Sequence, residues 1–177
     1  MKYQELYDDY VNLLQDYSEM RLELAALPTG GIAKKRITGK EYWYLQYTKF
    51  GKKHTEYLHE QKVEQVQAKL SRANQLRKEI KQVDARLEQL EQAVQILDTQ
   101  MSRSFFFLRQ CANMDALPLS KRSEALAFAN AMTALEGLPV SDEVNRGLDA
   151  WASGELKYKE VYFPFLQRYH VLEDDYV

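Results

Sequence analysis

Glu136 is the first candidate for a functional residue in this chain, because its carboxylate follows a run of small residues. Five alanines stand between positions 125 and 135, and alanine favours a helix. Gly137 suits the left-handed conformation after the last helical turn, and Pro139 prevents the helix from resuming. A carboxylate there faces the negative end of the helix dipole, so a cation from a partner would stabilise it. The spacing predicts either a helix that offers Glu136 to a positively charged group or a plain solvated glutamate.

The other residues with catalytic or metal-binding chemistry are scattered along the chain. His54, His59 and His170 have no metal-ligand spacing to one another or to Cys111. No glycine-rich phosphate loop of a known type is present in the sequence. The carboxylates at positions 174 and 175 are expected to form a solvated tail. The sequence therefore predicts a protein that is not an enzyme, with no metal site and no cofactor.

Between positions 120 and 170 a series of features follows in a fixed order. The alanine-rich helix over 125–135 ends in Glu136-Gly137-Leu138 and is followed by Ser141-Asp142-Glu143, by the turn Ser153-Gly154-Glu155-Leu156, and by a last helix over 159–169. In order and spacing this segment resembles the VbhA-like antitoxins, which bind and inhibit Fic-domain toxins. That family opens its inhibitory motif with Ser or Thr four residues before the Glu, where this chain has Met132.

The resemblance implies inhibition by direct binding. In that family the glutamate pairs with the toxin arginine that otherwise holds the γ-phosphate of ATP. An arginine binds carboxylate and phosphate through the same planar fork and cannot hold both at once. The resemblance assigns this contact to Glu136 and Gly137, with Ala131, Ala134 and Leu135 packed against the toxin. The expected function is that of an antitoxin, and the expected partner is a Fic-type adenylyltransferase.

Composition indicates a mostly helical protein without a membrane-spanning segment. The hydrophobic fraction of 45% can fill a modest core, and glycine and proline are scarce. No apolar run approaches the ~20 residues needed to cross a bilayer, and the first five residues begin no signal peptide. The single cysteine, Cys111, rules out an internal disulfide and follows an aromatic run that predicts burial. We expect a cytoplasmic protein that does not bind membranes.

Charge is segregated along the chain, although the net charge is only -2. Residues 28–58 hold seven basic and two acidic side chains, whereas residues 115–177 hold six basic and eleven acidic ones. A basic sheet with exposed aromatic residues could bind DNA or RNA. The alternative is that the aromatic residues only stabilise a small sheet and the lysines prevent edge pairing. The candidate nucleic-acid-binding residues are Lys34, Lys35, Arg36, Lys40, Lys52 and Lys53.

Hydrophobic periodicity predicts the elements of the first half. A helix is expected over 3–26, and three short strands over 32–37, 41–49 and 52–58, joined by two-residue turns that contain glycine. The segment from Leu27 through Tyr47 also resembles a small β domain of uncharacterised bacterial proteins, a resemblance that implies no activity.

A long helix is expected next, over about 60–100. Its apolar residues are spaced three or four apart from Val63 to Leu97, as in a coiled-coil seam. The first helix could fold back along part of this seam, and the rest could pack on the C-terminal module, on a second copy of the chain or on a partner. We expect an interruption at 102–104 and a linker over 114–119. The phenylalanines at 105–107 are expected either in the core or as an anchor between two modules.

These elements predict a mainly α fold. It would be a long antiparallel helical hairpin with a small three-stranded antiparallel β-sheet at its tip, followed by a small C-terminal helical module. The expected domains are 1–112 and 113–177. Two alternatives to the antitoxin stay open: a nucleic-acid-binding regulator that acts through the basic sheet, and a structural coiled-coil adaptor.

Overall fold

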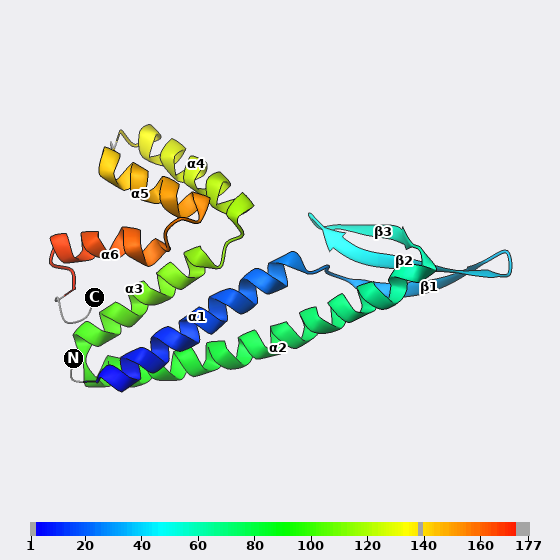
Figure 1. Ribbon diagram of the computed structural model, residues 1–177, viewed down its shortest axis with the longest axis horizontal. Helices are drawn as coiled ribbons and strands as arrows, with labels where there is room; N and C mark the ends of the chain where they lie inside the picture. Colours follow the sequence, from blue (N-terminus) through cyan, green and yellow to red (C-terminus); the bar gives the residue numbers. More distant parts are fainter. Residues whose placement is uncertain (1–2, 138–139, 173–177) are drawn as a thin grey trace. The chain divides into compact units, whose positions relative to one another are not determined.

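The computed structural model describes residues 3–137 and 140–172. Within these residues the chain forms six helices and one three-stranded antiparallel sheet (Figure 1). The fold is mainly helical, and the sheet is inserted in the chain between the two helices of an antiparallel hairpin, as the sequence predicts. The elements are α1 (Gln4–Ala26), β1 (Gly31–Ile37), β2 (Lys40–Lys49), β3 (Lys52–Leu58), α2 (Glu60–Leu97), α3 (Thr99–Asp115), α4 (Leu119–Leu135), α5 (Asp142–Ser153) and α6 (Tyr158–Arg168).

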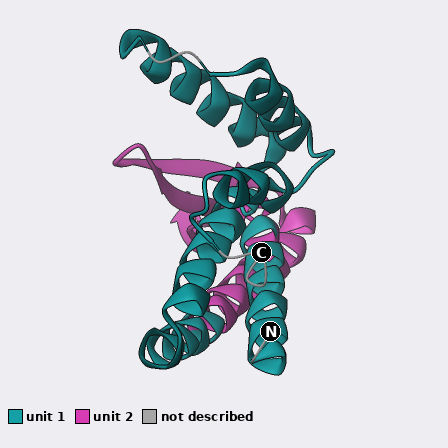
Figure 2. Cartoon of the chain, turned by 90° about the vertical axis from the view of Figure 1, so that its left-hand side faces the viewer, with its two compact units in different colours: residues 1–22, 82–177 teal, residues 23–81 magenta. Residues whose placement is uncertain are grey.

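The chain divides into two compact units (Figure 2). Unit 1 comprises residues 1–22 and 82–177, and unit 2 comprises residues 23–81. The domain boundary expected near residue 112 stays a prediction, and α3 runs through that position without a break. The features expected at Leu138, Pro139, Asp174 and Asp175 lie outside the described residues.

Unit 2 contains the sheet, in the strand order β1-β2-β3. Both turns have two residues with positive φ: Thr38 and Gly39 at 47° and 82°, and Phe50 and Gly51 at 51° and 73°. Two such residues define the type I′ turn, which matches the twist of a hairpin. The strands lie within one residue of their predicted bounds. In the helical part of this unit, Arg72 binds both carboxylate oxygens of Glu23 at 2.7 Å.

The core of unit 1 is centred on Tyr10 of α1, which is fully buried. Its ring stacks on Phe105 of α3 with centroids 3.7 Å apart. Its hydroxyl donates to Glu91 of α2 at 2.6 Å and to the Phe105 carbonyl at 3.1 Å. Of the phenylalanines at 105–107, only Phe105 is buried, while Phe106 is exposed. The aromatic run is therefore divided between core and surface.

The interruption of the long helix differs from the expectation. The break falls at Asp98, whose side chain accepts hydrogen bonds from the backbone N–H groups of Gln100 and Met101 at 2.9 and 3.0 Å. A short acidic side chain in this position satisfies the free donors at a helix start. The predicted interruption at 102–104 is wrong, because these residues lie inside α3 and Ser104 is fully buried. The linker is also shorter than expected, since α3 ends at Asp115 and α4 begins at Leu119.

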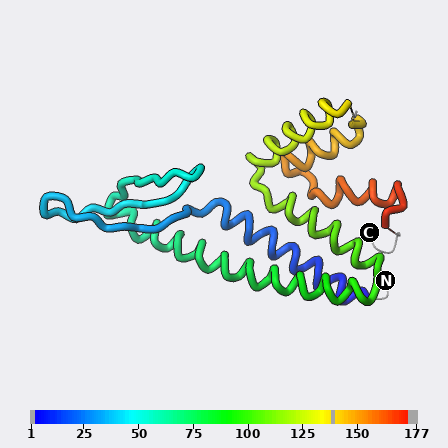
Figure 3. The backbone as a smooth tube through the Cα atoms, turned by 180° about the vertical axis from the view of Figure 1, so that it is seen from behind, coloured from blue at the N-terminus to red at the C-terminus, as the bar shows by residue number. Residues whose placement is uncertain are grey.

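The last four helices pack through a small core in unit 1. Trp151, Ala152 and Val161 form its buried centre, and Leu126 and Leu148 pack against them. Helices α4 and α5 lie side by side, and α6 lies beside α3 (Figures 1 and 3). The Ser141 side chain caps the start of α5. Gly154 then ends α5 in the left-handed conformation, at φ 86°.

Candidate interaction surface on helix α4

Helix α4 is fixed to its neighbours near its first turn by Arg122, which is buried. Its guanidinium donates to three backbone carbonyls, those of Asp115 at 2.7 Å, Leu117 at 3.0 Å and Trp151 at 3.1 Å. The cation also lies over the Trp151 ring, 5.3 Å from its centroid. A charged group hydrogen-bonded to carbonyls at helix ends is a strong anchor. Arg122 therefore joins the ends of α3 and α5 to the start of α4.

The second half of α4 is exposed over most of its surface. Phe128, Met132 and Leu135 expose 70%, 42% and 83% of their surface. These positions are four and three residues apart, so they form one line along the helix, which we call the apolar stripe. Leu126 and Thr133 lie on the opposite, more covered side of the helix. The stripe is therefore an uncovered helix face in the described part of the chain.

The helix ends where the sequence predicts. Leu135 is the last helical residue, Glu136 is the cap, and Gly137 has φ 69°. The Gly137 N–H donates to the Ala134 carbonyl at 3.2 Å and closes the last turn. The Glu136 side chain is exposed and makes no ion pair or hydrogen bond with the described residues. Its carboxylate is thus available to a group outside this chain.

All five residues that the resemblance assigns to the toxin contact lie together at this end of α4. Ala131, Ala134 and Leu135 are exposed in the last turns, directly before Glu136 and Gly137. Phe128 and Met132 were not among the contact residues that the resemblance implies. Their spacing to Leu135 was a usable signal, but the sequence alone did not show which side of the helix is covered.

Thr133 does not replace the hydroxyl that the antitoxin family places four residues before the glutamate. Its Oγ1 donates to the carbonyls of Ala129 at 3.2 Å and Asn130 at 3.1 Å, within its own helix. The family position itself carries Met132, which belongs to the apolar stripe. This end of the helix is therefore more apolar than the family motif.

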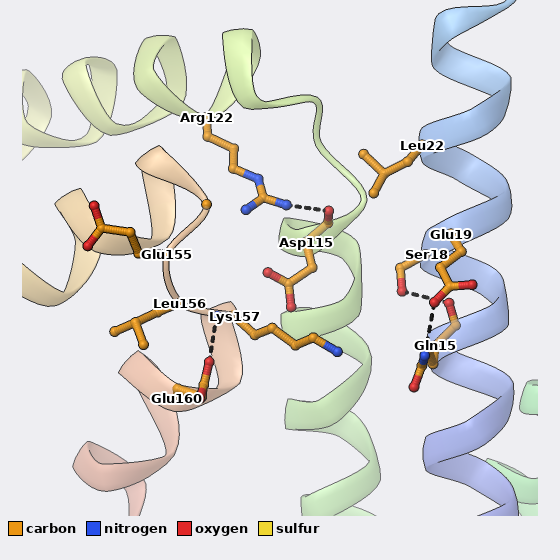
Figure 4. A pocket seen from close by; sticks show the side chains of 11 residues that line it. Gln15, Ser18, Glu19, Leu22, Asp115, Arg122, Glu155, Leu156, Lys157 and Glu160 are labelled. Atoms are coloured by element: carbon orange, nitrogen blue, oxygen red, sulfur yellow. Dashed lines mark hydrogen bonds between the residues drawn. The ribbon is translucent and has the colours of Figure 1, made fainter.

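A cavity of about 500 Å³ lies in unit 1, near the start of α4. Figure 4 shows its lining from α1, α3, α4 and the turn before α6. Its main charged groups already have partners. Asp115 accepts from the Trp151 indole at 3.0 Å and from the Tyr158 N–H at 2.9 Å, and Glu160 accepts from the Lys157 N–H at 2.7 Å. The bonds of Asp115 join α3 to α5 and α6, whereas the Glu160 bond caps the start of α6, so these groups serve the packing and capping of the helices.

The six candidate nucleic-acid-binding residues divide between the two faces of the sheet. Side chains alternate along a strand, and residues paired across strands share a face. The register places Lys34, Arg36 and Lys52 on one face and Lys35, Lys40 and Lys53 on the other. On the first face Lys34 forms an ion pair with Glu41. The sheet therefore has two chemically different sides.

Among the residues that the structure describes, none of the His, Cys, Asp and Glu side chains form a group of three or more that could hold a metal ion. Cys111 is buried, and burial raises the pKa of its thiol to about 12. The described helices include none that is both long and apolar enough to cross a bilayer.

Comparison with family models shows what the first part of the chain is similar to. Residues 3–68 match a family described as Domain of unknown function (DUF6788). The match covers α1, the sheet and the start of α2, and it leaves α3 to α6 unmatched. Comparisons with curated proteins and with solved structures gave no match. The helix that carries the apolar stripe and Glu136 thus lies outside the matched segment.

Proposed function

We propose that this chain is a cytoplasmic antitoxin, without catalytic activity of its own, that binds and inhibits a Fic-type adenylyltransferase. The observation that supports this most directly is the apolar stripe of α4, which leads to the exposed carboxylate of Glu136. The resemblance of residues 120–170 to VbhA-like antitoxins supplies the class of partner.

The stripe has the form of a helix that docks in a groove. Such helices present apolar anchors at positions i, i+4 and i+7, which here are Phe128, Met132 and Leu135. Full burial of a phenylalanine or leucine side chain contributes roughly 1.5–3 kcal/mol. Ala131, on the flank of the stripe, lets a partner helix approach closely. The stripe would supply affinity, and the carboxylate would supply inhibition.

Glu136 would act on the toxin through charge. Its carboxylate would occupy the fork of the arginine that otherwise positions the γ-phosphate of ATP. Without that arginine the toxin loses positioning and charge stabilisation at the reacting phosphates. No catalytic group of the toxin has to be altered.

The anchoring of α4 supports the same proposal. Arg122 holds the start of the helix through three carbonyls, so the exposed half is presented as a formed helix before binding. A preformed binding element avoids the entropic cost of ordering on association.

The test is co-purification of the full chain with the protein encoded by the neighbouring gene, which the proposal expects to be a Fic-domain protein with a His-Pro-Phe motif followed by Gly-Asn and Arg. Adenylylation is then measured with labelled ATP. We expect the wild-type complex to be inactive and the Glu136→Ala complex to be active. Both complexes should elute together on gel filtration, because the apolar stripe is unchanged.

The matched control is Glu124→Ala, a second exposed glutamate on the same helix. Its complex should stay inactive. Equal inhibition by wild-type protein and Glu136→Ala would contradict the role of the carboxylate, and failure to form any complex would contradict the antitoxin. A stable oligomer of this chain, together with a Glu136→Ala variant that does not change adenylylation, would favour the structural adaptor instead.

A further inference from the structure

One face of the sheet combines three tyrosines with three lysines. The register places Tyr42, Tyr44 and Tyr57 on this side of the sheet. Their rings are neighbours: Tyr57 lies 6.2 Å from Tyr42 and 5.9 Å from Tyr44, centroid to centroid. Tyr57 is 50% exposed. We call this side the tyrosine face, and its basic residues are Lys35, Lys40 and Lys53.

The tyrosine face carries only positive charge on its strands. No strand residue of this face is an aspartate or glutamate. Lys35 lies over the Tyr44 ring, 5.1 Å from its centroid, and all three lysines are exposed. Cations beside aromatic rings form a surface that attracts phosphates and offers flat apolar area.

The opposite face differs in charge and in hydrogen bonding. It carries both glutamates of the strands, Glu41 and Glu56. Glu41 forms the ion pair with Lys34, and Glu56 accepts a hydrogen bond from the Tyr47 hydroxyl. These carboxylates would repel a phosphate chain. An anionic ligand is therefore favoured on the tyrosine face.

We propose that the tyrosine face binds single-stranded nucleic acid. Bases would stack on Tyr57 and its neighbours Tyr42 and Tyr44, and phosphates would pair with the three lysines. In a duplex the base faces are covered by their own stacking, so tyrosines on a flat sheet can reach only unpaired bases. A polyanion without bases would use the lysines but not the rings.

A hollow of about 350 Å³ beside the start of β1 supports this ligand. Four of its lining residues, Gln46, Thr48, Lys53 and Thr55, belong to the tyrosine face by register, and Tyr47 and His54 of the opposite face also contribute. Amide and hydroxyl groups can donate to and accept from the edge of an unstacked base. The proposal goes beyond toxin inhibition, because it uses none of the residues of α4.

The experiment measures fluorescence anisotropy of a labelled 12-nucleotide oligo(dT) or oligo(U) with the full chain. Stacking contributes roughly 1–3 kcal/mol per base, so Tyr57→Ala should weaken binding about 5-fold to 150-fold. Replacing the exposed Lys35, Lys40 and Lys53 by alanine should lower the slope of log affinity against log salt by about 2. Circular dichroism checks that each variant keeps its fold.

The matched control changes the basic residues of the opposite face, as Arg36→Ala/Lys52→Ala. These residues are equally exposed, so the control should change affinity less than about 3-fold at physiological salt, where distant charges are screened. Equal losses from both faces, preference for a 12-base-pair duplex, or no binding at 50 mM salt would overturn the proposal. Glu136→Ala should leave oligonucleotide binding unchanged, which separates this test from that of the antitoxin.

Discussion

Arg122 lies over the indole of Trp151 and donates a hydrogen bond to the carbonyl of the same residue at 3.1 Å. The two residues are far apart in the chain, and both are buried. Their contact fixes the start of α4 against the end of α5. The exposed half of α4, with the apolar stripe and Glu136, extends from this anchor.

Arg122→Ala should destabilise the C-terminal helices. Three hydrogen bonds from a charged group to carbonyls are lost, and the free energy of unfolding should fall by about 3 kcal/mol. Urea unfolding followed by circular dichroism measures this. The control, Lys121→Ala, removes only an exposed ion pair with Glu124 and should cost less than about 1 kcal/mol. Equal effects would show that Arg122 is not the anchor.

The two sides of α4 should respond differently to truncation. Leu126 packs against the buried Trp151 core, so Leu126→Ala should lower the free energy of unfolding by about 1–2 kcal/mol. Phe128 is exposed, and Phe128→Ala should change the free energy of unfolding by less than about 0.5 kcal/mol. Phe128→Ala should nevertheless weaken the complex with the toxin, measured by calorimetric titration. A large loss of stability in Phe128→Ala would mean that the stripe is covered within the chain.

Gly30 and Gly31 offer a matched test of the entry into the sheet. A Cβ on Gly30 would stand 2.0 Å from the Gln46 carbonyl oxygen, and its φ is +103°. Gly30→Ala should therefore destabilise the sheet by more than about 2 kcal/mol. A Cβ on Gly31 meets no atom within 4 Å, so Gly31→Ala should be nearly neutral. Thermal unfolding of both variants, followed by near-ultraviolet circular dichroism, compares them directly, and equal midpoints would contradict this geometry.

Cys111 should make stability depend on pH in the alkaline range. Burial, followed by the charge of Asp115, raises the pKa of its thiol from 9.0 to about 12 in the folded chain. Below about pH 9 the thiol is protonated in both the folded and the unfolded state, and its full contribution to the free energy of unfolding is present. Between about 9 and 12 only the unfolded state releases the proton, so stability falls by up to about 1.4 kcal/mol per pH unit.

The measurement is urea unfolding at several pH values for wild-type protein and Cys111→Ala. The variant starts from a lower stability because a buried side chain is truncated, so the slopes are compared and not the absolute values. We expect a shallower decline in the variant above pH 9. Parallel slopes would show that the thiol does not keep its proton in the folded state.

Local patterns in the sequence predicted most of the elements. The alternation of residues and the Thr38-Gly39 and Phe50-Gly51 turns gave the three strands, since both signals depend on neighbours in the chain. The break of the long helix was missed, although Asp98 carries a known capping signal. The hydrophobic periodicity runs up to Leu97, and the serines at 102 and 104 were the more obvious polar residues.

What the sequence determined by itself is the set of helices and strands and the helix that ends at Glu136 and Gly137, because backbone propensity and capping act within a few residues. Only the tertiary structure decided which surfaces are free. Phe128 and Leu126 are both apolar residues of α4, and the packing on Trp151 leaves one exposed and covers the other. Such choices depend on contacts between residues distant in the chain, which local patterns do not encode.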